Sequence, residues 1–146
     1  MTAIRVLFLC TGNSARSIIG AALLWQMGGE AFEVYSAGTH PKGINPYTVR
    51  VLEPLGIDLS AERSKNVSEY TGEAFDYVIT VCDAAAEECP VFPGAPERIH
   101  WSFDDPAAVT GGEDERQRAF DNTAKQLLAR LRLWMSLPAI RSRLDA

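Results

Sequence analysis

An apolar run near the amino end of the chain passes directly into a short polar loop and then into a helical pattern. Residues 4–9 (IRVLFL) have the composition of a buried strand, and residues 10–17 (CTGNSARS) follow them. The apolar positions after this loop then repeat with helical spacing. The order predicts a strand over 4–10, a tight loop, and a helix over 14–28. Backbone amides in such a loop and the amino end of the helix both attract an anion, so the segment predicts an oxyanion cradle.

Cys10 and Arg16 bracket this loop. A thiol beside a helix amino end and a cation is favoured as the reactive thiolate, and a guanidinium offers a planar fork to a tetrahedral anion. A lone cysteine after a strand is often only a small buried hydrophobe, and glycine with asparagine often marks only a turn. The arginine at this spacing, together with the strand and the helix start, favours a functional site.

Composition bounds the class of protein. The chain has 146 residues, of which 47% are hydrophobic and 23% are charged, which predicts one globular domain over 1–146. A net charge of −5 argues against general affinity for nucleic acid or anionic membranes. The sequence shows neither the pattern of a signal peptide nor an apolar run of the ~20 residues that span a bilayer. Together with three cysteines in no secreted-scaffold spacing, this predicts a cytoplasmic chain with free thiols, which we expect to be a monomer.

Extended and helical segments alternate along the chain. We expect strands over 4–10, 33–37, 77–81 and 98–101, and helices over 14–28, from 45–46 to near 56, and from about 114 to 135. Such alternation is typical of an α/β fold: a four-stranded parallel sheet flanked by helices on both faces. Ligands of these folds bind at the carboxyl ends of the strands. Cys10, Cys82 and the segment after Trp101 all fall at that edge.

Two further cysteines follow the third predicted strand. Cys82 comes directly after it, and Cys89 lies seven positions later, before Pro90. The spacing differs from that of zinc sites and no histidine is near, so we expect no bound metal. The two sulfurs can meet only if the short helix expected between them reorganises. Isolated buried thiols are usually inert, but their place at the edge that holds Cys10 also allows a disulfide relay.

A carboxylate and two histidines are the remaining candidates for catalytic residues. Asp105 follows the fourth strand, where it can protonate a leaving oxygen above the cradle, although Asp-Pro is also a common turn. His40 and His100 have no partner at catalytic spacing, so we interpret both as surface or strand-flanking residues.

The chain resembles a known family at these positions. Residues 10–17 resemble the phosphate loop of the low-molecular-weight protein tyrosine phosphatases, and the resemblance continues through 35–38 (YSAG), 45–46 (NP) and 105–106 (DP). Within that superfamily the chain most resembles the thioredoxin-coupled arsenate reductases, through 78–82 (VITVC), Cys89-Pro90 and 100–107 (HWSFDDPA). The resemblance covers residues 4 to about 130 and implies the phosphotyrosine phosphatase I-like fold.

The resemblance also implies a role for each loop residue. Cys10 is the expected nucleophile, Asn13 shapes the loop, and Ser17 hydrogen-bonds the Cys10 thiolate. Arg16 and the loop amides hold the oxyanion. The expected substrate-binding residues are Thr11, Gly12, Asn13, Ser14, Ala15, Arg16 and Ser17.

The remaining implied roles belong to a redox cycle. Arsenate, which phosphate or sulfate can mimic, forms an adduct with Cys10, and Asp105 is the expected general acid. Cys82 then attacks Cys10 and releases arsenite, and Cys89 attacks Cys82. Thioredoxin is the expected reductant of the resulting Cys82–Cys89 disulfide, with no bound cofactor, although the sequence alone does not separate it from glutaredoxin or mycothiol systems.

The chain departs from its relatives in places. Many relatives carry a second cysteine in the loop where this chain has Ala15, a position outside the relay. Some bind potassium through acidic residues at the positions of Ala21 and Lys65, so we expect no such cation here; the Lys65 ammonium can fill similar space. The tail beyond about residue 136 exceeds the usual family length and receives no function.

Two other functions stay open from the sequence alone. The first is a tyrosine phosphatase working through a Cys10 phosphoenzyme. Such phosphatases place aromatic residues after the Asp-Pro pair, where this chain has Ala107 and Ala108. The second is a non-enzymatic sensor of anions or redox state that uses the same loop and thiols.

Overall fold

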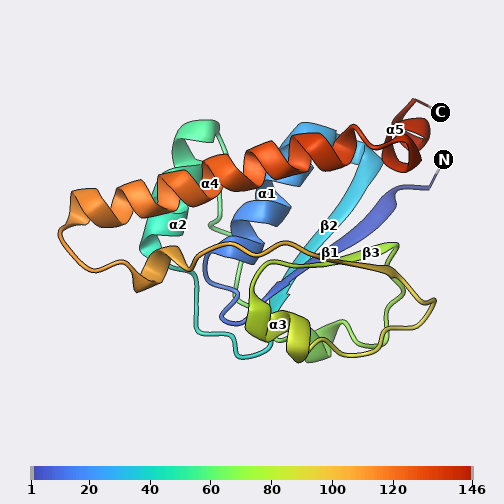
Figure 1. The fold of residues 1–146 in the computed structure, drawn as a ribbon, viewed down its shortest axis with the longest axis horizontal. Helices are drawn as coiled ribbons and strands as arrows, with labels where there is room; N and C mark the ends of the chain where they lie inside the picture. The colour runs from blue at the N-terminus through green and yellow to red at the C-terminus, as the bar shows by residue number, and fades with distance from the viewer. Residues whose placement is uncertain (1, 146) are drawn as a thin grey trace.

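A parallel sheet organises the chain. The computed structural model describes residues 2–145. In chain order its main elements are β1 (Ile4–Cys10), α1 (Arg16–Gly28), β2 (Phe32–Gly38), α2 (Pro46–Leu52), β3 (Tyr77–Thr80), α3 (Asp83–Glu87), β4 (Glu97–His100), α4 (Glu113–Met135) and α5 (Pro138–Leu144). The four strands lie in the order β2-β1-β3-β4 and every pair is parallel, which confirms the predicted fold class (Figure 1).

Strand β1 is the centre of the core. Its residues from Val6 to Leu9 are fully buried, because β1 has a strand on each side and is covered on both faces. On one face Phe8 packs toward Gly20 of α1. A strand buried on both faces carries a continuous apolar run rather than an alternating one, which explains why this segment was recognisable from sequence.

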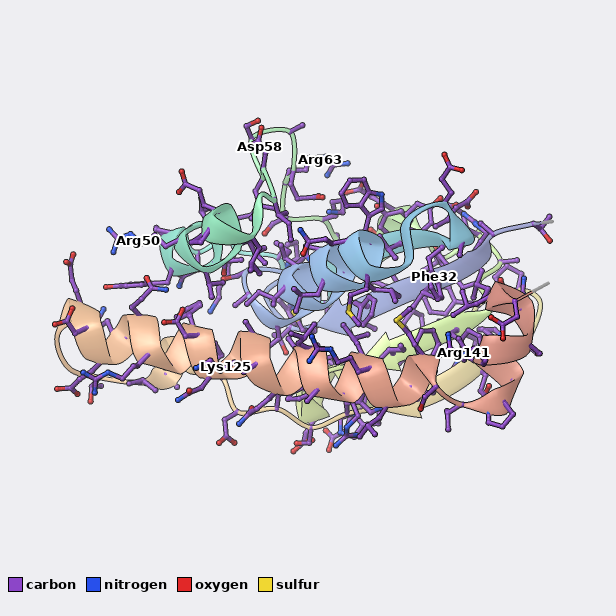
Figure 2. All side chains as sticks on the ribbon, turned by 90° about the horizontal axis from the view of Figure 1, so that it is seen from above. Phe32, Arg50, Asp58, Arg63, Lys125 and Arg141 are labelled. Carbon is purple, nitrogen blue, oxygen red and sulfur yellow. The ribbon has the colours of Figure 1, made fainter. Side chains whose placement is uncertain are left out.

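The long helices cover one face of the sheet. Helix α4 packs along α1 and α2, and its buried side chains are Phe120, Thr123, Ala124, Leu127, Leu131 and Trp134 (Figures 1 and 2). The loop that carries Asp58 and Arg63 projects at the periphery beyond α2 (Figure 2). The other face is covered by shorter pieces. Tyr35, Tyr70, Phe75 and Phe92 form an edge-to-face aromatic cluster there, and α3 lies below the strands in Figure 1.

The observed boundaries differ from the expected ones where loops or proline intervene. Helix α1 begins at Arg16 rather than at 14, since the preceding residues form the polar loop. The helix expected to reach 56 ends at Leu52 and continues as a 3-10 turn over Glu53–Leu55, because Pro54 lacks an amide hydrogen. The tail forms α5, whose Ile140 is buried at 1% exposure.

Trp134 joins α4 to the sheet. Its ring contacts those of Phe32, Tyr77 and Trp101, with centroids 5.8, 5.3 and 6.4 Å away. Only 3% of this residue is exposed, whereas the adjacent Leu133 is 66% exposed.

We therefore expect Trp134→Ala to lower the free energy of unfolding by about 3–5 kcal/mol, the usual cost of truncating a buried aromatic residue. Leu133→Ala on the same helix is the matched control and should change it by about 0.5 kcal/mol or less. Urea unfolding followed by tryptophan fluorescence and circular dichroism measures both. Equal losses in the two variants would contradict this account of how α4 is held.

Candidate active site

The loop after β1 turns its carbonyl groups outward. Each carbonyl from Cys10 to Ser14 accepts a hydrogen bond from a residue in the loop after β2, in α2 or in the loop after α2. In order, the donors are Thr39 N, His40 N, Lys42 N, Ser64 Oγ, and Asn45 N with Thr48 Oγ1. The backbone donors lie 2.8–3.1 Å from their acceptors. This neighbouring chain fixes which way each peptide of the loop faces.

The loop amides consequently converge on the inside. Within residues 2–145, none of the amides of residues 11–16 donates a hydrogen bond to another protein group. Buried amides are normally paired, so a set left unpaired around one point indicates an anion site. The amino end of α1 adds its positive dipole at the same place.

A chain of side-chain hydrogen bonds reaches the Cys10 sulfur. Asn13 Oδ1 accepts from the amide of Lys65 at 2.8 Å, so its Nδ2 faces Ser17 Oγ and donates to it at 2.8 Å. Ser17 Oγ in turn lies 2.8 Å from Cys10 Sγ. Because Asn13 occupies an acceptor position of the hydroxyl, the Ser17 proton is directed at the sulfur. Ser17 can thus stabilise a Cys10 thiolate.

Two backbone features make this tight loop possible. Asn13 adopts a left-handed conformation (φ 43°), which asparagine tolerates better than most residues. Gly38, at the end of β2, lies against the loop. A Cβ atom there would be 2.4 Å from the Thr11 carbonyl oxygen and 2.8 Å from the Asn13 nitrogen. Only glycine allows this approach without displacing the loop.

Arg16 and Asp105 form the mouth of the site. The Arg16 side chain is 14% exposed; its Nη1 donates to the Phe103 carbonyl at 3.0 Å, and its Nη2 lies 3.9 Å from Asp105 Oδ2. Asp105 Oδ1 accepts from the Ala107 amide at 3.0 Å, which holds the carboxyl group at the start of a 3-10 turn over Pro106–Ala108. The structure therefore brings the predicted cation and the predicted acid together.

A cavity of about 240 Å³ lies over the cradle. Its lining consists of Cys10, Thr11, Gly12, Ser14, Ala15, Arg16, His40, Lys42 and Asp105. His40 and Lys42, from the loop after β2, were not identified as site residues from the sequence. The one available signal was that β2 is parallel to β1 and ends at the same edge. Lys42 gives the site a second permanent cation beside Arg16.

Cys82 lies next to the loop and Cys89 lies further out. Cys82 is 5% exposed, and its Sγ is 3.3 Å from Thr11 Oγ1. Cys89 is half-buried after α3, and partial burial raises the pKa of its thiol above the ordinary value, while the charge of Arg98 acts in the opposite direction. The structure thus brings one further thiol to the oxyanion loop and leaves the other beyond a helix.

The comparisons with known proteins agree with this geometry. Residues 5–142 match the family model of the low molecular weight phosphotyrosine protein phosphatases. The chain belongs to this family. An arsenate reductase of Bacillus subtilis is 38% identical over 87% of this chain and 91% of its own length, and one of Halalkalibacterium halodurans is 36% identical over the same shares.

Solved structures show the same fold. An arsenate reductase in a phosphate-binding state superposes with a TM-score of 0.72 at 22% identity, covering 91% of this chain and 97% of that one. A thioredoxin-dependent arsenate reductase of Corynebacterium glutamicum has a TM-score of 0.66 at 31% identity, covering 92% of this chain and 61% of that one.

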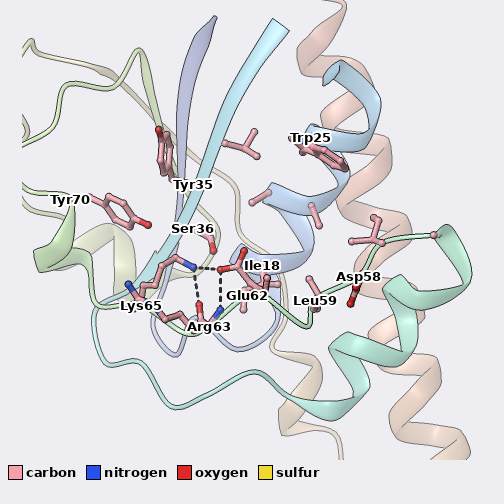
Figure 3. Close-up of a pocket in the computed structure, with 16 residues that line it drawn as sticks. Ile18, Trp25, Tyr35, Ser36, Asp58, Leu59, Glu62, Arg63, Lys65 and Tyr70 are labelled. Atoms are coloured by element: carbon pink, nitrogen blue, oxygen red, sulfur yellow. Dashed lines mark hydrogen bonds and ion pairs between the residues drawn. The ribbon is translucent and has the colours of Figure 1, made fainter. Parts of the chain in front are cut away.

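A larger cavity of about 680 Å³ lies behind the oxyanion loop, between α1, β2 and the loop after α2. Trp25, 57% exposed, borders it. Lys65 is buried there, and its ammonium donates to Glu62 Oε1 at 2.5 Å and to the Arg63 carbonyl at 2.8 Å (Figure 3). Since the Lys65 amide also holds Asn13, the ion pair between the buried Lys65 and the exposed Glu62 supports the loop from behind. The expectation that no potassium binds here stays a prediction.

Among residues 2–145, no group of three or more His, Cys, Asp or Glu side chains is placed to hold a metal ion. No helix in that range is both long and apolar enough to cross a membrane.

The close approach of Gly38 to the loop yields a prediction. Gly38→Ala forces the loop away from β2, and overpacking of this kind costs about 1–3 kcal/mol, so phosphate affinity should fall roughly tenfold. Gly72→Ala is the control, because a Cβ there meets no atom within 4 Å. Protection of Cys10 from alkylation by increasing phosphate, read by mass spectrometry, measures the affinity. Unchanged protection in Gly38→Ala would show that the loop does not depend on this contact.

Proposed function

We propose that the chain is an arsenate reductase that works through Cys10, Cys82 and Cys89 and is recycled by thioredoxin. The observation that carries the proposal is the buried Cys82 thiol in contact with the oxyanion loop, with its Sγ 3.3 Å from Thr11 Oγ1. A hydrolytic phosphatase needs only the first thiol. A second thiol beside the loop is what an adduct of Cys10 requires in order to be reduced.

The first step forms the adduct. The loop amides, Arg16 and Lys42 hold arsenate, which has the shape and charge of phosphate. The Cys10 thiolate, stabilised by Ser17, attacks arsenic, and an oxygen leaves as water. Asp105 lies beside Arg16 at the mouth of the site, where in its protonated form it gives the proton that this leaving oxygen needs.

The second step transfers the electrons. The Cys82 thiolate attacks Cys10 Sγ, so a Cys10–Cys82 disulfide forms as the sulfur–arsenic bond breaks. The electron pair of that bond stays on arsenic, which leaves as arsenite in the trivalent state. Two thiols have then lost two electrons, and arsenic has gained two. Thr11 follows Cys10 in the loop, and its contact with the Cys82 sulfur supports an attack of Cys82 on Cys10.

The third step restores the nucleophile. Cys89 attacks Cys82 Sγ and releases the Cys10 thiolate, an exchange with no net oxidation. The Cys82–Cys89 disulfide then lies on the α3 side of the site, and a dithiol reductant of the thioredoxin class returns both thiols. The similarity to curated arsenate reductases and to a thioredoxin-dependent one supports this assignment.

The lining of the cavity favours a small inorganic anion over phosphotyrosine. In the described part of the chain, no Phe, Tyr or Trp lines the cavity over Cys10. Ala107 and Ala108 follow Asp105-Pro106 and offer no ring to grip a phenyl group. Two cations in a cavity of about 240 Å³ suit a compact oxyanion better than an aryl ester.

The proposal predicts a thioredoxin-dependent turnover that needs all three cysteines. With arsenate, thioredoxin, thioredoxin reductase and NADPH, the wild-type chain should consume NADPH steadily. Cys10→Ser should abolish this activity and any aryl phosphatase activity. Cys82→Ser should lose arsenite release but keep hydrolysis of a small aryl phosphate, which needs only Cys10, Arg16 and an acid.

The Cys89 variant separates the steps. Cys89→Ser should release one equivalent of arsenite and then hold a Cys10–Cys82 disulfide, detected by non-reducing peptide mapping. Sustained turnover of arsenate by this variant with thioredoxin would contradict the relay. Phosphate release from an aryl phosphate by the wild type, without NADPH consumption in the arsenate assay, would favour the phosphatase function instead.

The raised pKa of Cys89 predicts the pH dependence of the third step. Only the thiolate attacks, and burial raises the pKa of Cys89 above its ordinary value, so formation of the Cys82–Cys89 disulfide should accelerate from pH 8 and should not yet level off at about pH 9. Single-turnover mixing with acid quenching and peptide mapping gives the rate. Arg98→Ala removes the charge that lowers this pKa and should slow the step at pH 8, whereas Arg98→Lys should keep the wild-type rate. A rate independent of pH in this range would place the limit elsewhere.

A further inference from the structure

Helix α3 stands between the two relay thiols. It spans Asp83–Glu87, with Cys82 directly before it and Cys89 just beyond its end. Seven residues at the helical rise of 1.5 Å span about 10 Å, whereas a disulfide needs Cα atoms within about 7 Å. Formation of the Cys82–Cys89 disulfide therefore requires α3 to unwind, so whatever stabilises α3 favours the dithiol.

Apolar packing holds α3 weakly. Within the helix only Ala85 is buried, and the other side chains are exposed. A single helical turn is unstable on its own, because helix nucleation is costly. Cys82, at the amino end, makes no capping hydrogen bond with its side chain. Polar contacts at the ends of α3 therefore have a large share in holding it.

His100 makes such a contact at the amino end. Its Nε2 lies 2.9 Å from Asp83 Oδ1, and its Nδ1 lies 2.8 Å from Thr80 Oγ1 on the neighbouring strand. These contacts fit a ring that donates from Nε2 and accepts at Nδ1 from the hydroxyl. Ser102 Oγ donates to the same Asp83 oxygen at 3.1 Å. The hydrogen bonds from His100 and Ser102 lower the pKa of Asp83, so this carboxyl group is ionised at neutral pH.

The second histidine approaches the other end of α3. His40 Nε2 lies 3.4 Å from Glu88 Oε2, on the residue between α3 and Cys89. These two side chains are 71% and 51% exposed, and those of His100 and Asp83 are 38% and 78% exposed. The contact of His40 is the weaker one because its distance is longer, 3.4 Å against 2.9 Å. The two histidines of the chain thus face the two ends of α3.

We propose that His100 is a positioning residue that holds α3 through Asp83 and thereby raises the reduction potential of the Cys82–Cys89 pair. This inference rests on the proposed relay but concerns residues with no part in the thiol chemistry. An interaction present in the dithiol and lost when α3 unwinds makes the disulfide easier to reduce, which favours its return by an external dithiol. The exchange is balanced: two electrons and two protons pass from the reductant to the two sulfurs.

Equilibration of the full chain with mixtures of reduced and oxidised dithiothreitol tests this. Acid quenching, alkylation and peptide mapping give the fraction of Cys82–Cys89 disulfide. His100→Ala should favour the disulfide roughly fivefold relative to wild type, which is about 20 mV more negative. His100→Gln, whose amide can replace the Nε2 donor, should stay within about twofold of wild type, since a retained hydrogen bond retains its effect.

Two acidic residues of α3 provide the matched pair of variants. Asp83→Ala should shift the equilibrium at least as far as His100→Ala does, because it also removes the hydrogen bond from Ser102. The double variant should shift it no further than Asp83→Ala alone, because the contact with His100 is already lost. Glu87→Ala removes the same charge from the other end of α3, where a carboxylate opposes the helix dipole, so it should not favour the disulfide. Asp83 is 78% exposed, so its truncation leaves the core intact.

The outcomes separate a failure of the role of His100 from a failure of the cysteine relay. A potential in His100→Ala and Asp83→Ala equal to that of wild type, or an equal shift in Glu87→Ala, would overturn the role of His100 while leaving the relay in place. Additive shifts in the double variant would show that the two residues act separately, which also overturns it. Absence of any Cys82–Cys89 disulfide in the wild type would overturn the relay itself and this inference with it.

Discussion

The orientation of six peptide groups after β1 is the constraint on which the rest of the site depends. Without hydrogen bonds from neighbouring segments, a polar loop would point its carbonyls and amides in mixed directions and would form no anion site. Here the loop after β2, α2 itself and the loop after α2 hold the carbonyls of residues 10–14, so the amides of residues 11–16 face one point. Those donor segments are in turn held by the parallel pairing of β1 with β2. The anion site is therefore a property of the whole sheet edge.

The same constraint explains which parts of the molecule the sequence could predict. The apolar run before Cys10, the loop spacing to Arg16 and the capping Asn45 are local patterns, and the structure has them as expected. Asn45 caps α2 by accepting from the Tyr47 amide at 2.9 Å, and its own amide also donates to the Ser14 carbonyl. The capping role is visible in the sequence, whereas the second contact depends on how two distant segments meet.

Residues that act through tertiary contacts were missed for this reason. His40 and Lys42 reach the cavity only because β2 ends beside β1, and the sequence shows them as ordinary polar loop residues. His100 was interpreted as strand-flanking, which describes its place in β4 but not its contact with Asp83, 17 positions earlier. Helix α5 was not expected, because the tail has little apolar periodicity and its one buried residue, Ile140, is decided by packing.

The closeness of the two chain ends has a practical consequence. Arg143 of α5 donates to the Thr2 carbonyl at 3.4 Å and lies 3.7 Å from Asp76. Both ends therefore lie at the amino edge of the sheet, with the length of β1 between them and Cys10 (Figure 1). A tag, a fused partner or a solid support joined at either end would stand on the far side from the oxyanion loop and α3. The molecule can thus be tethered by either end without covering the edge of the sheet that carries Cys10 and α3.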